Sequence, residues 1–581
     1  MLTIANRKWL FSIAVCALLA ACGKKAEEPE SVSPLGDTAG LLRYVPADTP
    51  YLFAALAPVP EDFMDKMEPK IDQILATYRT ILQETVKSES EYAAEEDRDA
   101  EREARIEGIV EELTTLLSVD GLRGVGLTRD STTVLYGNGL LPVLRISLSD
   151  AALLDAAIAR IESRAGYEMS VGDISGNAYR YVDADKVRVI VATLGGQLVV
   201  TVMPMSFDDA RLEQLLGLVL PGKNLAESGT LQAIAEEYDY LPEYIGFIST
   251  ERLVDTFLDE PTGLNVELLA LFDYDASMLS DVCKSEIRSI AAVMPRVVTG
   301  YEEITVDRVK SSLVIELRQD IAAGLATIPA AVPGLGKSYD GLLSFGMSLN
   351  PKAAREFYEA RLDALEANPY ECEQLADFQQ GIAAGRAALN QPVPPVVYDF
   401  RGFLAVVKDL EGFDINRKAP PEMIDASFLL AIDNAPALLA LGQMTIPGLA
   451  AVTIEPNGEP QKIELPVAQA GIDSAWIALT ETSLAVSLSE DGETTLPVLL
   501  RSESASPPPF VSIGLDAARY YAMLGEALAQ AEGEDEELSE EMQAAIVELL
   551  VAAGDFYSRL AVDVRFTARG IEVDGDMMLA D

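Results

Sequence analysis

The side chains that most often carry catalysis are sparse in this 581-residue chain, which contains no histidine. Without histidine the chain has no Ser-His or Cys-His nucleophile, no histidine acid–base catalysis and no histidine ligation of metals. No Ser-x-x-Lys sequence occurs either, which removes that type of serine–lysine pair. The sequence therefore favours a protein that is not an enzyme.

Motifs for phosphate and calcium are incomplete. Gly336-Lys337-Ser338 looks like the end of a phosphate-binding loop, but Ala331 stands where that loop requires its first glycine. Asp183-Ala-Asp185 and Glu490-Asp491-Gly492 are fragments of a calcium loop that are more typical of turns. A pair of carboxylates could act as acid and base, but 93 acidic residues offer no way to select one. We name no catalytic residue, no cofactor and no metal ligand.

The N-terminus has the layout of a secretory signal. Arg7 and Lys8 precede an apolar run from Trp9 to Leu19 and a group of small residues. The run is too short to span a bilayer, which needs about 20 residues. Residues 1–21 are therefore predicted to be a signal peptide.

The ending Leu19-Ala20-Ala21-Cys22 resembles the lipobox of bacterial lipoproteins. The resemblance implies cleavage before Cys22, a diacylglycerol on its sulfur and a fatty acid on the new amine. Gly23 stands where an aspartate would favour retention in the inner membrane, so the resemblance implies the outer membrane, with the protein facing the periplasm. An ordinary signal with a chance cysteine is the alternative. Residues 22–40, rich in Glu, Pro, Ser and Gly, are expected to form a flexible tether.

Two cysteines remain after Cys22, namely Cys283 and Cys372. An even remainder in an oxidising compartment suggests one disulfide between them. The bond would close a loop with 88 residues between the two cysteines. For a loop of this length the chain-entropy model gives a stabilisation of the folded state of about 4 to 5 kcal/mol. Two buried free thiols are the alternative.

The chain is strongly acidic. Its formal net charge is −49, and loss of residues 1–21 changes it to −51. This field repels nucleic acid and anionic lipid headgroups, so we expect no nucleic-acid partner. A generally acidic, soluble surface is the simplest interpretation, although basic partners and cations would also be attracted.

Features of the first half of the chain return in the same order in the second half. The strand, turn and helix expected at 51–67 have the same layout as residues 342–358. Arg123-Gly124 matches Arg401-Gly402, and apolar residues then alternate with others at Phe403, Ala405 and Val407. Hairpins near 187–202 and 475–488 and strand–helix pairs at 242–258 and 508–524 continue the series. We interpret this as an internal duplication, with units at 41–320 and 337–581 and a connector at 321–336.

Each unit mixes strands and hairpins with helices that do not alternate strictly with the strands. This pattern favours an α+β fold, a mostly antiparallel sheet with packed helices. Apolar residues from Phe63 to Ile81 recur every three to four positions, which predicts a long helical insertion. The polar run at 87–105 is expected to be its solvated tip or, alternatively, a partner-binding arm. If Cys283 and Cys372 pair, the bond should tie the two units together.

"LRYVPADTPYLFA" at 42–54 resembles the opening of a group of uncharacterised proteins of bacterial envelopes. The resemblance covers about a dozen residues and the two-unit layout, and it implies no activity. Aromatic residues at Tyr238, Tyr240 and Tyr244 are expected to pack in the core rather than bind a ligand.

The function favoured by the sequence is that of a non-enzymatic lipoprotein, a scaffold or assembly factor for other envelope proteins. A binding protein that holds a small or lipidic ligand in a groove is the alternative. An enzyme that uses carboxylates or a lone serine is the third hypothesis.

Overall fold

The computed structural model describes residues 39–92, 100–412, 423–445, 453–464, 474–530 and 540–580. These residues combine helices with a large antiparallel sheet, which confirms the predicted α+β class. No helix in these ranges is long and apolar enough to cross a membrane.

The chain divides into two compact units that are not continuous in sequence. The first contains the described residues up to Leu279, then Arg296–Ser311 and Ser539–Ala552. The second contains Ser280–Pro295, Ser312–Leu538 and Ala553–Asp581. Strand β10 (Arg308–Glu316) and helix α20 (Glu540–Phe556) therefore have residues in both.

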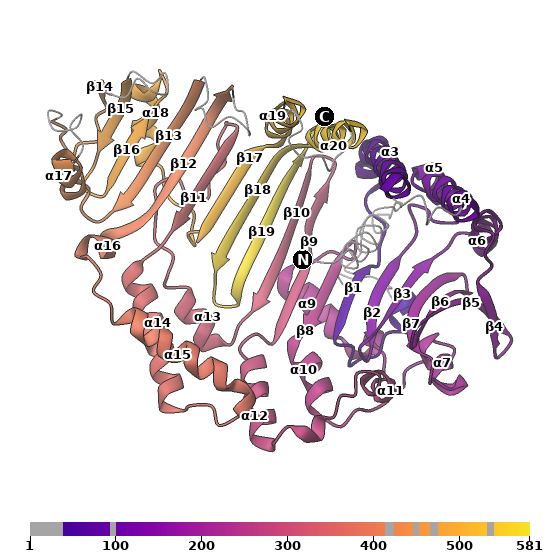
Figure 1. The fold of residues 1–581 in the computed structure, drawn as a ribbon. Helices are drawn as coiled ribbons and strands as arrows, with labels where there is room; N and C mark the ends of the chain where they lie inside the picture. Colours follow the sequence, from indigo (N-terminus) through magenta and orange to yellow (C-terminus); the bar gives the residue numbers. More distant parts are fainter. Residues whose placement is uncertain are drawn as a thin grey trace, which may run out of the picture. The chain divides into compact units, whose positions relative to one another are not determined.

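The described strands of the first unit form an antiparallel sheet in the order β9-β8-β1-β2-β3-β7-β6-β5-β4 (Figure 1). The predicted hairpin near 187–202 is confirmed, since Gly195 and Gly196 join β6 to β7 and both have positive φ angles. The strands are β1 (Tyr51–Ala55), β2 (Thr133–Asn138), β3 (Leu141–Ser147), β4 (Ser170–Ile174), β5 (Asn177–Ala184), β6 (Val187–Leu194), β7 (Gln197–Pro204), β8 (Ile245–Ser249) and β9 (Arg296–Thr305).

The helices of the first unit include the predicted long insertion, now seen as α3 and α4. Its apolar stripe is buried at Met64, Met67 and Leu75, while residues 93–99 of the acidic run lie outside the described part. Asp150 caps the start of α6 by accepting the Ala152 N–H, and Gly166 ends it in the left-handed conformation. The helices are α2 (Ala39–Leu42), α3 (Glu61–Tyr92), α4 (Ala100–Leu116), α5 (Val119–Arg123), α6 (Ala151–Ala165), α7 (Asp209–Leu215), α8 (Leu225–Ser228), α9 (Thr230–Tyr238), α10 (Thr250–Leu258), α11 (Asn265–Ala270) and the 3-10 turn Ala276–Met278.

The core of the first unit encloses an arginine. Arg145 on β3 is 1% exposed, and its guanidinium lies 4.0 Å from the ring centre of Tyr44. It donates hydrogen bonds to the Gln197 side-chain oxygen at 3.0 Å, the Tyr136 hydroxyl at 3.3 Å and the Leu216 carbonyl. Its bonds in the described residues go to neutral acceptors, so carbonyl dipoles and the aromatic face stabilise the buried charge.

The described strands of the second unit are also paired antiparallel, in the order β19-β18-β17-β11-β12-β13-β16-β15-β14. The expected strand from Phe403 to Val407 is confirmed as part of β12. The strands are β11 (Leu343–Ser348), β12 (Phe400–Glu411), β13 (Met423–Ile432), β14 (Gln461–Glu464), β15 (Ser474–Leu479), β16 (Ser483–Ser487), β17 (Val511–Asp516), β18 (Tyr557–Phe566) and β19 (Gly570–Leu579).

A smaller buried cluster, with Leu439, Ile477 and Leu479, lies on one side of this sheet near β15 and β16. The main core lies on the other side, where Leu404, Val406 and Leu429 pack against Leu496 and Leu499 of α18. The segment 321–336, expected to be a connector, also enters this core through Val332 and Leu335, neither of which is exposed. The helices are α12 (Asp281–Ala291), α13 (Gln319–Leu325), α14 (Pro351–Ala367), the 3-10 turn Glu373–Leu375, α15 (Ala376–Leu389), α16 (Pro395–Asp399), α17 (Ala435–Thr445), α18 (Gly492–Arg501) and α19 (Ala517–Gln530).

Candidate apolar binding face

The residue predicted to carry the lipid, Cys22, lies outside the described residues, as do the signal peptide and residues 22–38 of the tether. The last two residues of the predicted tether, Ala39 and Gly40, begin helix α2. The prediction of a lipid anchor thus stays a prediction.

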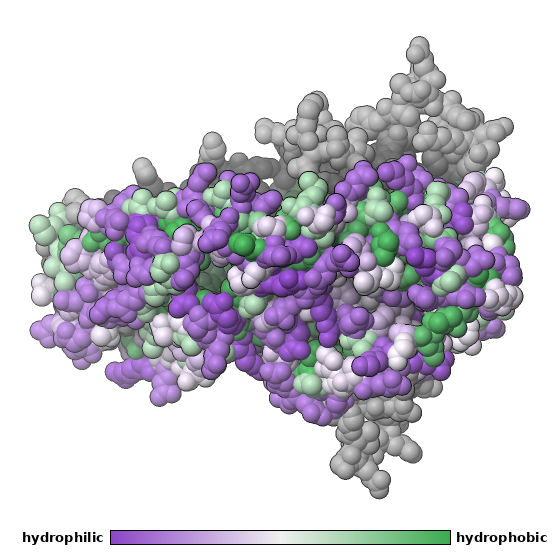
Figure 2. Space-filling model, turned by 90° about the horizontal axis from the view of Figure 1, so that it is seen from below, coloured by the Kyte–Doolittle hydropathy of each residue, from purple (hydrophilic) through white to green (hydrophobic). Residues whose placement is uncertain are grey.

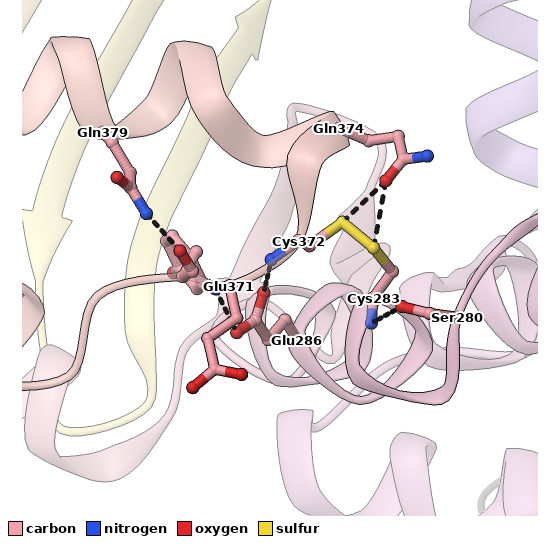
Figure 3. Close-up of a disulfide and its surroundings, with 8 residues drawn as sticks. Ser280, Cys283, Glu286, Glu371, Cys372, Gln374 and Gln379 are labelled. Carbon is pink, nitrogen blue, oxygen red and sulfur yellow. Dashed lines mark hydrogen bonds between the residues drawn. A yellow bond between two sulfur atoms is a disulfide. The ribbon is translucent and has the colours of Figure 1, made fainter.

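Cys283 and Cys372 are joined by a disulfide, with Cα atoms 4.7 Å apart (Figure 3). The Ser280 hydroxyl caps α12 by accepting the N–H of Cys283 at 3.2 Å. One turn later, the Glu286 carboxylate accepts the N–H groups of Glu371 and Cys372 at 2.8 and 3.0 Å. These contacts hold α12 against the residues around Cys372, so both cysteines belong to the second unit. The bond therefore joins residues of the two predicted ranges, 41–320 and 337–581, but lies within one of the two compact units.

The tyrosine cluster serves the core of the first unit, as expected. Tyr238 and Tyr240 are buried, and their rings stack with centres 5.5 Å apart. Tyr244 packs against Tyr301 with ring centres 5.2 Å apart, and burial raises the pKa of both hydroxyls.

The second unit carries an apolar layer on the side of its sheet opposite the core. Strand register aligns these side chains in three rows across β18, β17, β11, β12, β13 and β16. We call the 18 positions the apolar face. The rows are Val562–Ile513–Phe345–Ala405–Phe428–Val486, Val564–Val511–Met347–Phe403–Leu430–Leu484 and Leu560–Leu515–Leu343–Val407–Ala426–Leu488.

Every position of the apolar face is apolar, and none of the 18 is buried. Phe428 is 43% exposed, and Phe345 and Val562 are each 38% exposed. The Phe403 ring lies between those of Phe345 and Phe428, with centres 5.6 and 5.9 Å away. An antiparallel sheet with one face on a core normally turns polar residues to water, so this pattern is reversed.

The opposite, buried side of the same strands combines Leu404, Val406 and Leu429 with several small residues. Ser344, Ser348 and Ser487 are buried there, and the first two donate to the carbonyls of Gly514 and Pro509 at 3.4 and 2.7 Å. Small residues are required because the chain approaches closely: a Cβ on Gly346 would lie 2.6 Å from Leu335. The phenylalanines of the central strands, Phe345, Phe403 and Phe428, lie on the outer side.

Charged and apolar groups border the apolar face. Just beyond Val407, Lys408 pairs with Asp491 at 2.7 Å, and Arg519 pairs with Asp409 at 2.7 Å. At the β16 end, Leu484, Val486 and Leu488 also pack against the cluster that contains Leu439 of α17. Met444 of the same helix is 84% exposed. The arrangement of an apolar centre with a few polar groups at its edge is typical of ligand sites.

The apolar face covers a large part of the sheet, and most of its 18 positions are partly buried. Six strands at about 4.8 Å spacing and three rows at about 6.8 Å spacing give about 24 by 14 Å between outer Cα atoms. Contiguous apolar surface of several hundred Å² on a monomer is commonly functional. On the surface drawn in Figure 2, by comparison, hydrophilic residues predominate and apolar ones form separate small patches.

A cavity of about 430 Å³ in the second unit is a weaker candidate. Its lining includes Arg401, Asp433 and Ser504. Arg401 pairs with Asp433 and donates to the carbonyls of Tyr398 and Phe400, so its charge and much of its donor capacity are already satisfied. In the apolar face, Leu484, Val486 and Leu488 pack against the cluster around Leu439, while Phe345, Phe428 and Val562 stay exposed.

Comparison with known protein families, characterised proteins and solved structures finds no match for this chain. The assignment of a site therefore depends on the residues alone. Sequence reasoning placed Phe403, Ala405 and Val407 on a strand but did not identify their side as the exposed one. The serines and glycines at alternate positions of 344–348 were the signal that could have done so.

Proposed function

We propose that this protein holds the hydrocarbon part of an apolar or amphipathic ligand against the apolar face of its second unit. The observation that carries the proposal is the set of 18 half-exposed positions without one polar side chain. Burying such a surface contributes about 25 cal/mol per Å² of apolar area removed from water.

The lack of polar groups favours hydrocarbon over a protein surface as the occupant. Protein interfaces form about one hydrogen bond per 100–200 Å², and their partners bring backbone groups that need donors and acceptors. The apolar face offers neither, because its backbone groups are engaged in the sheet and its side chains are apolar. A hydrocarbon chain needs none. We therefore favour a ligand-binding function over the scaffold function that the sequence alone favoured.

The remaining parts of the proposal come from the sequence. We propose a non-enzymatic lipoprotein, anchored through acylated Cys22 at the periplasmic side of the outer membrane. The lipobox-like ending at residues 19–22 supports this location.

We also propose that the two units arose by internal duplication. The strand order supports it: β9-β8-β1-β2-β3-β7-β6 in the first unit corresponds to β18-β17-β11-β12-β13-β16-β15 in the second. Strands at the same place in the two sheet orders also follow one another in the same order along the chain.

Native mass spectrometry with a single-chain lipid tests the function. The chain from Gly23 onward, secreted and purified without detergent, would be titrated with palmitoyl lysophosphatidylethanolamine. This lipid has no net charge, which avoids repulsion by the acidic protein. We expect complexes that retain the lipid under native conditions and lose it on denaturation.

Phe428→Gln provides the decisive variant. With 43% of a side chain of about 200 Å² exposed, about 85 Å² is available to the ligand, worth about 2 kcal/mol or a 30-fold loss of affinity. Phe378→Gln is the matched control, because Phe378 is 55% exposed on α15, outside the apolar face. Equal affinities of the two variants would contradict the proposal. A dimer that binds no lipid would instead assign the apolar face to contact with a second copy of the chain. Another protein that stays bound through purification would assign it to a scaffold partner.

A further inference from the structure

We propose that the first unit carries a second, narrower strip for a hydrocarbon chain, so that one protein binds two chains. This inference rests on the proposed function. Its basis is a row of five apolar side chains, paired in register across β1, β2, β3, β7 and β6. The row is Phe53–Leu135–Leu144–Val200–Val191, and all five side chains are half-buried.

A second row lies beside the first and completes the strip. It contains Tyr51 of β1, the pair Gly137–Pro142 of β2 and β3, and the pair Val202–Val189 of β7 and β6. Its one polar side-chain atom, the Tyr51 hydroxyl, donates to the Leu140 carbonyl at 3.2 Å. The strip therefore presents no unsatisfied side-chain donor or acceptor and no charge.

Fully buried side chains lie on both sides of this sheet. Leu52, Val134, Val143 and Val199 are buried on the side away from the strip, and Ile146 and Ala55, next to Leu144 and Phe53, are buried at one edge of the strip. On the strip's own side, Asp155 of α6 accepts hydrogen bonds from Arg180 at 2.9 Å and Thr193 at 3.4 Å. The helix thus forms a wall along a strip that stays half-exposed.

The length and width of the strip indicate which kind of ligand it can bind. Five strands and two rows span about 19 by 7 Å between Cα atoms, a long and narrow shape. A stable protein interface uses about 20 to 30 residues on each side, whereas the strip has ten positions. A single extended hydrocarbon chain fits this shape and needs no hydrogen bonds from it.

Counting bound lipid molecules tests the inference on the same chain from Gly23 onward. We expect two molecules of palmitoyl lysophosphatidylethanolamine per protein at the lowest lipid concentration that fills both sites of the wild type, where a site weakened about 30-fold is largely empty. Val200→Gln in the strip and Phe428→Gln in the apolar face should each reduce the number from two to one, and the double variant should bind none. Val219→Gln is the control, because Val219 is 48% exposed in a loop of the same unit. Leu144→Gln replaces Val200→Gln if circular dichroism shows that the latter unfolds.

The outcomes separate the two proposals. One bound molecule, lost in Phe428→Gln and retained in Val200→Gln, would overturn the strip and leave the proposed function intact. Two molecules retained in both Val200→Gln and Leu144→Gln would also overturn it. A wild-type protein that binds no lipid would refute the proposed function together with the strip.

Discussion

Replacing Cys283 and Cys372 by serine should lower the free energy of unfolding of the second unit by about 4 to 5 kcal/mol. The bond joins residues 89 positions apart, and without it the unfolded chain gains the entropy of an open loop of that length. The folded state should change little, because Glu286 still holds the backbone of Glu371 and Cys372 against α12.

Tryptophan fluorescence during urea unfolding measures this change in one unit alone. The chain contains two tryptophans, Trp9 and Trp476, and the first lies in the predicted signal peptide. Trp476 is on β15 and packs against the core of the second unit, so a chain from Gly23 onward reports only on that unit. At a slope of about 3 kcal/mol per molar urea, the midpoint should fall by about 1.5 M.

A reductant supplies the matched control for this experiment. Dithiothreitol should lower the midpoint of the wild type by a similar amount and leave the double serine variant unchanged. A double variant whose midpoint stays within about 0.3 M of the wild type would refute the reasoning, because the bond would then not constrain the unfolded chain.

Three further substitutions test the fold. Arg145→Ala should destabilise the first unit by about 4 kcal/mol in thermal unfolding, because it leaves a cavity and buried acceptors without a donor. Gly402→Ala should destabilise the second unit by about 3 kcal/mol, since φ is +145° and a Cβ would lie 2.2 Å from the Met347 carbonyl oxygen. The hydrogen bond from Arg318 lowers the pKa of Asp320, so its stabilising effect is complete above the unfolded pKa of about 4 and is lost as pH falls through the folded value. Asp320→Asn should therefore reduce the acid-induced fall in the urea midpoint, and an unchanged pH profile would contradict this.

Much of the fold follows from local patterns in the sequence. The alternation at Phe403, Ala405 and Val407, the turn at Gly195-Gly196 and the helical periodicity after Phe63 each determine an element through nearest-neighbour geometry. The division of the chain was harder to predict, because Ser280–Pro295 belongs to the second unit through contacts made far along the sequence.

The candidate site could not be located in this way. Alternation separates the two faces of a strand, but it does not say which face meets the core. The usual assumption that apolar residues are inside assigns Phe345 and Phe428 to the core. Only the close approach of Leu335 and Val332 to the glycines of β11 and β12 places the smaller side chains inside, and that approach depends on tertiary structure.

The second sheet reverses the usual relation between side-chain size and freedom to vary in evolution. Its buried positions hold small residues such as Gly346, Ser348 and Ser487, and a larger residue there would meet neighbouring backbone or core atoms. Its exposed positions carry the large residues, which can exchange Leu for Ile, Val or Met as long as they stay apolar. Among descendants of this sequence, the small buried residues should therefore change more slowly than the large exposed ones.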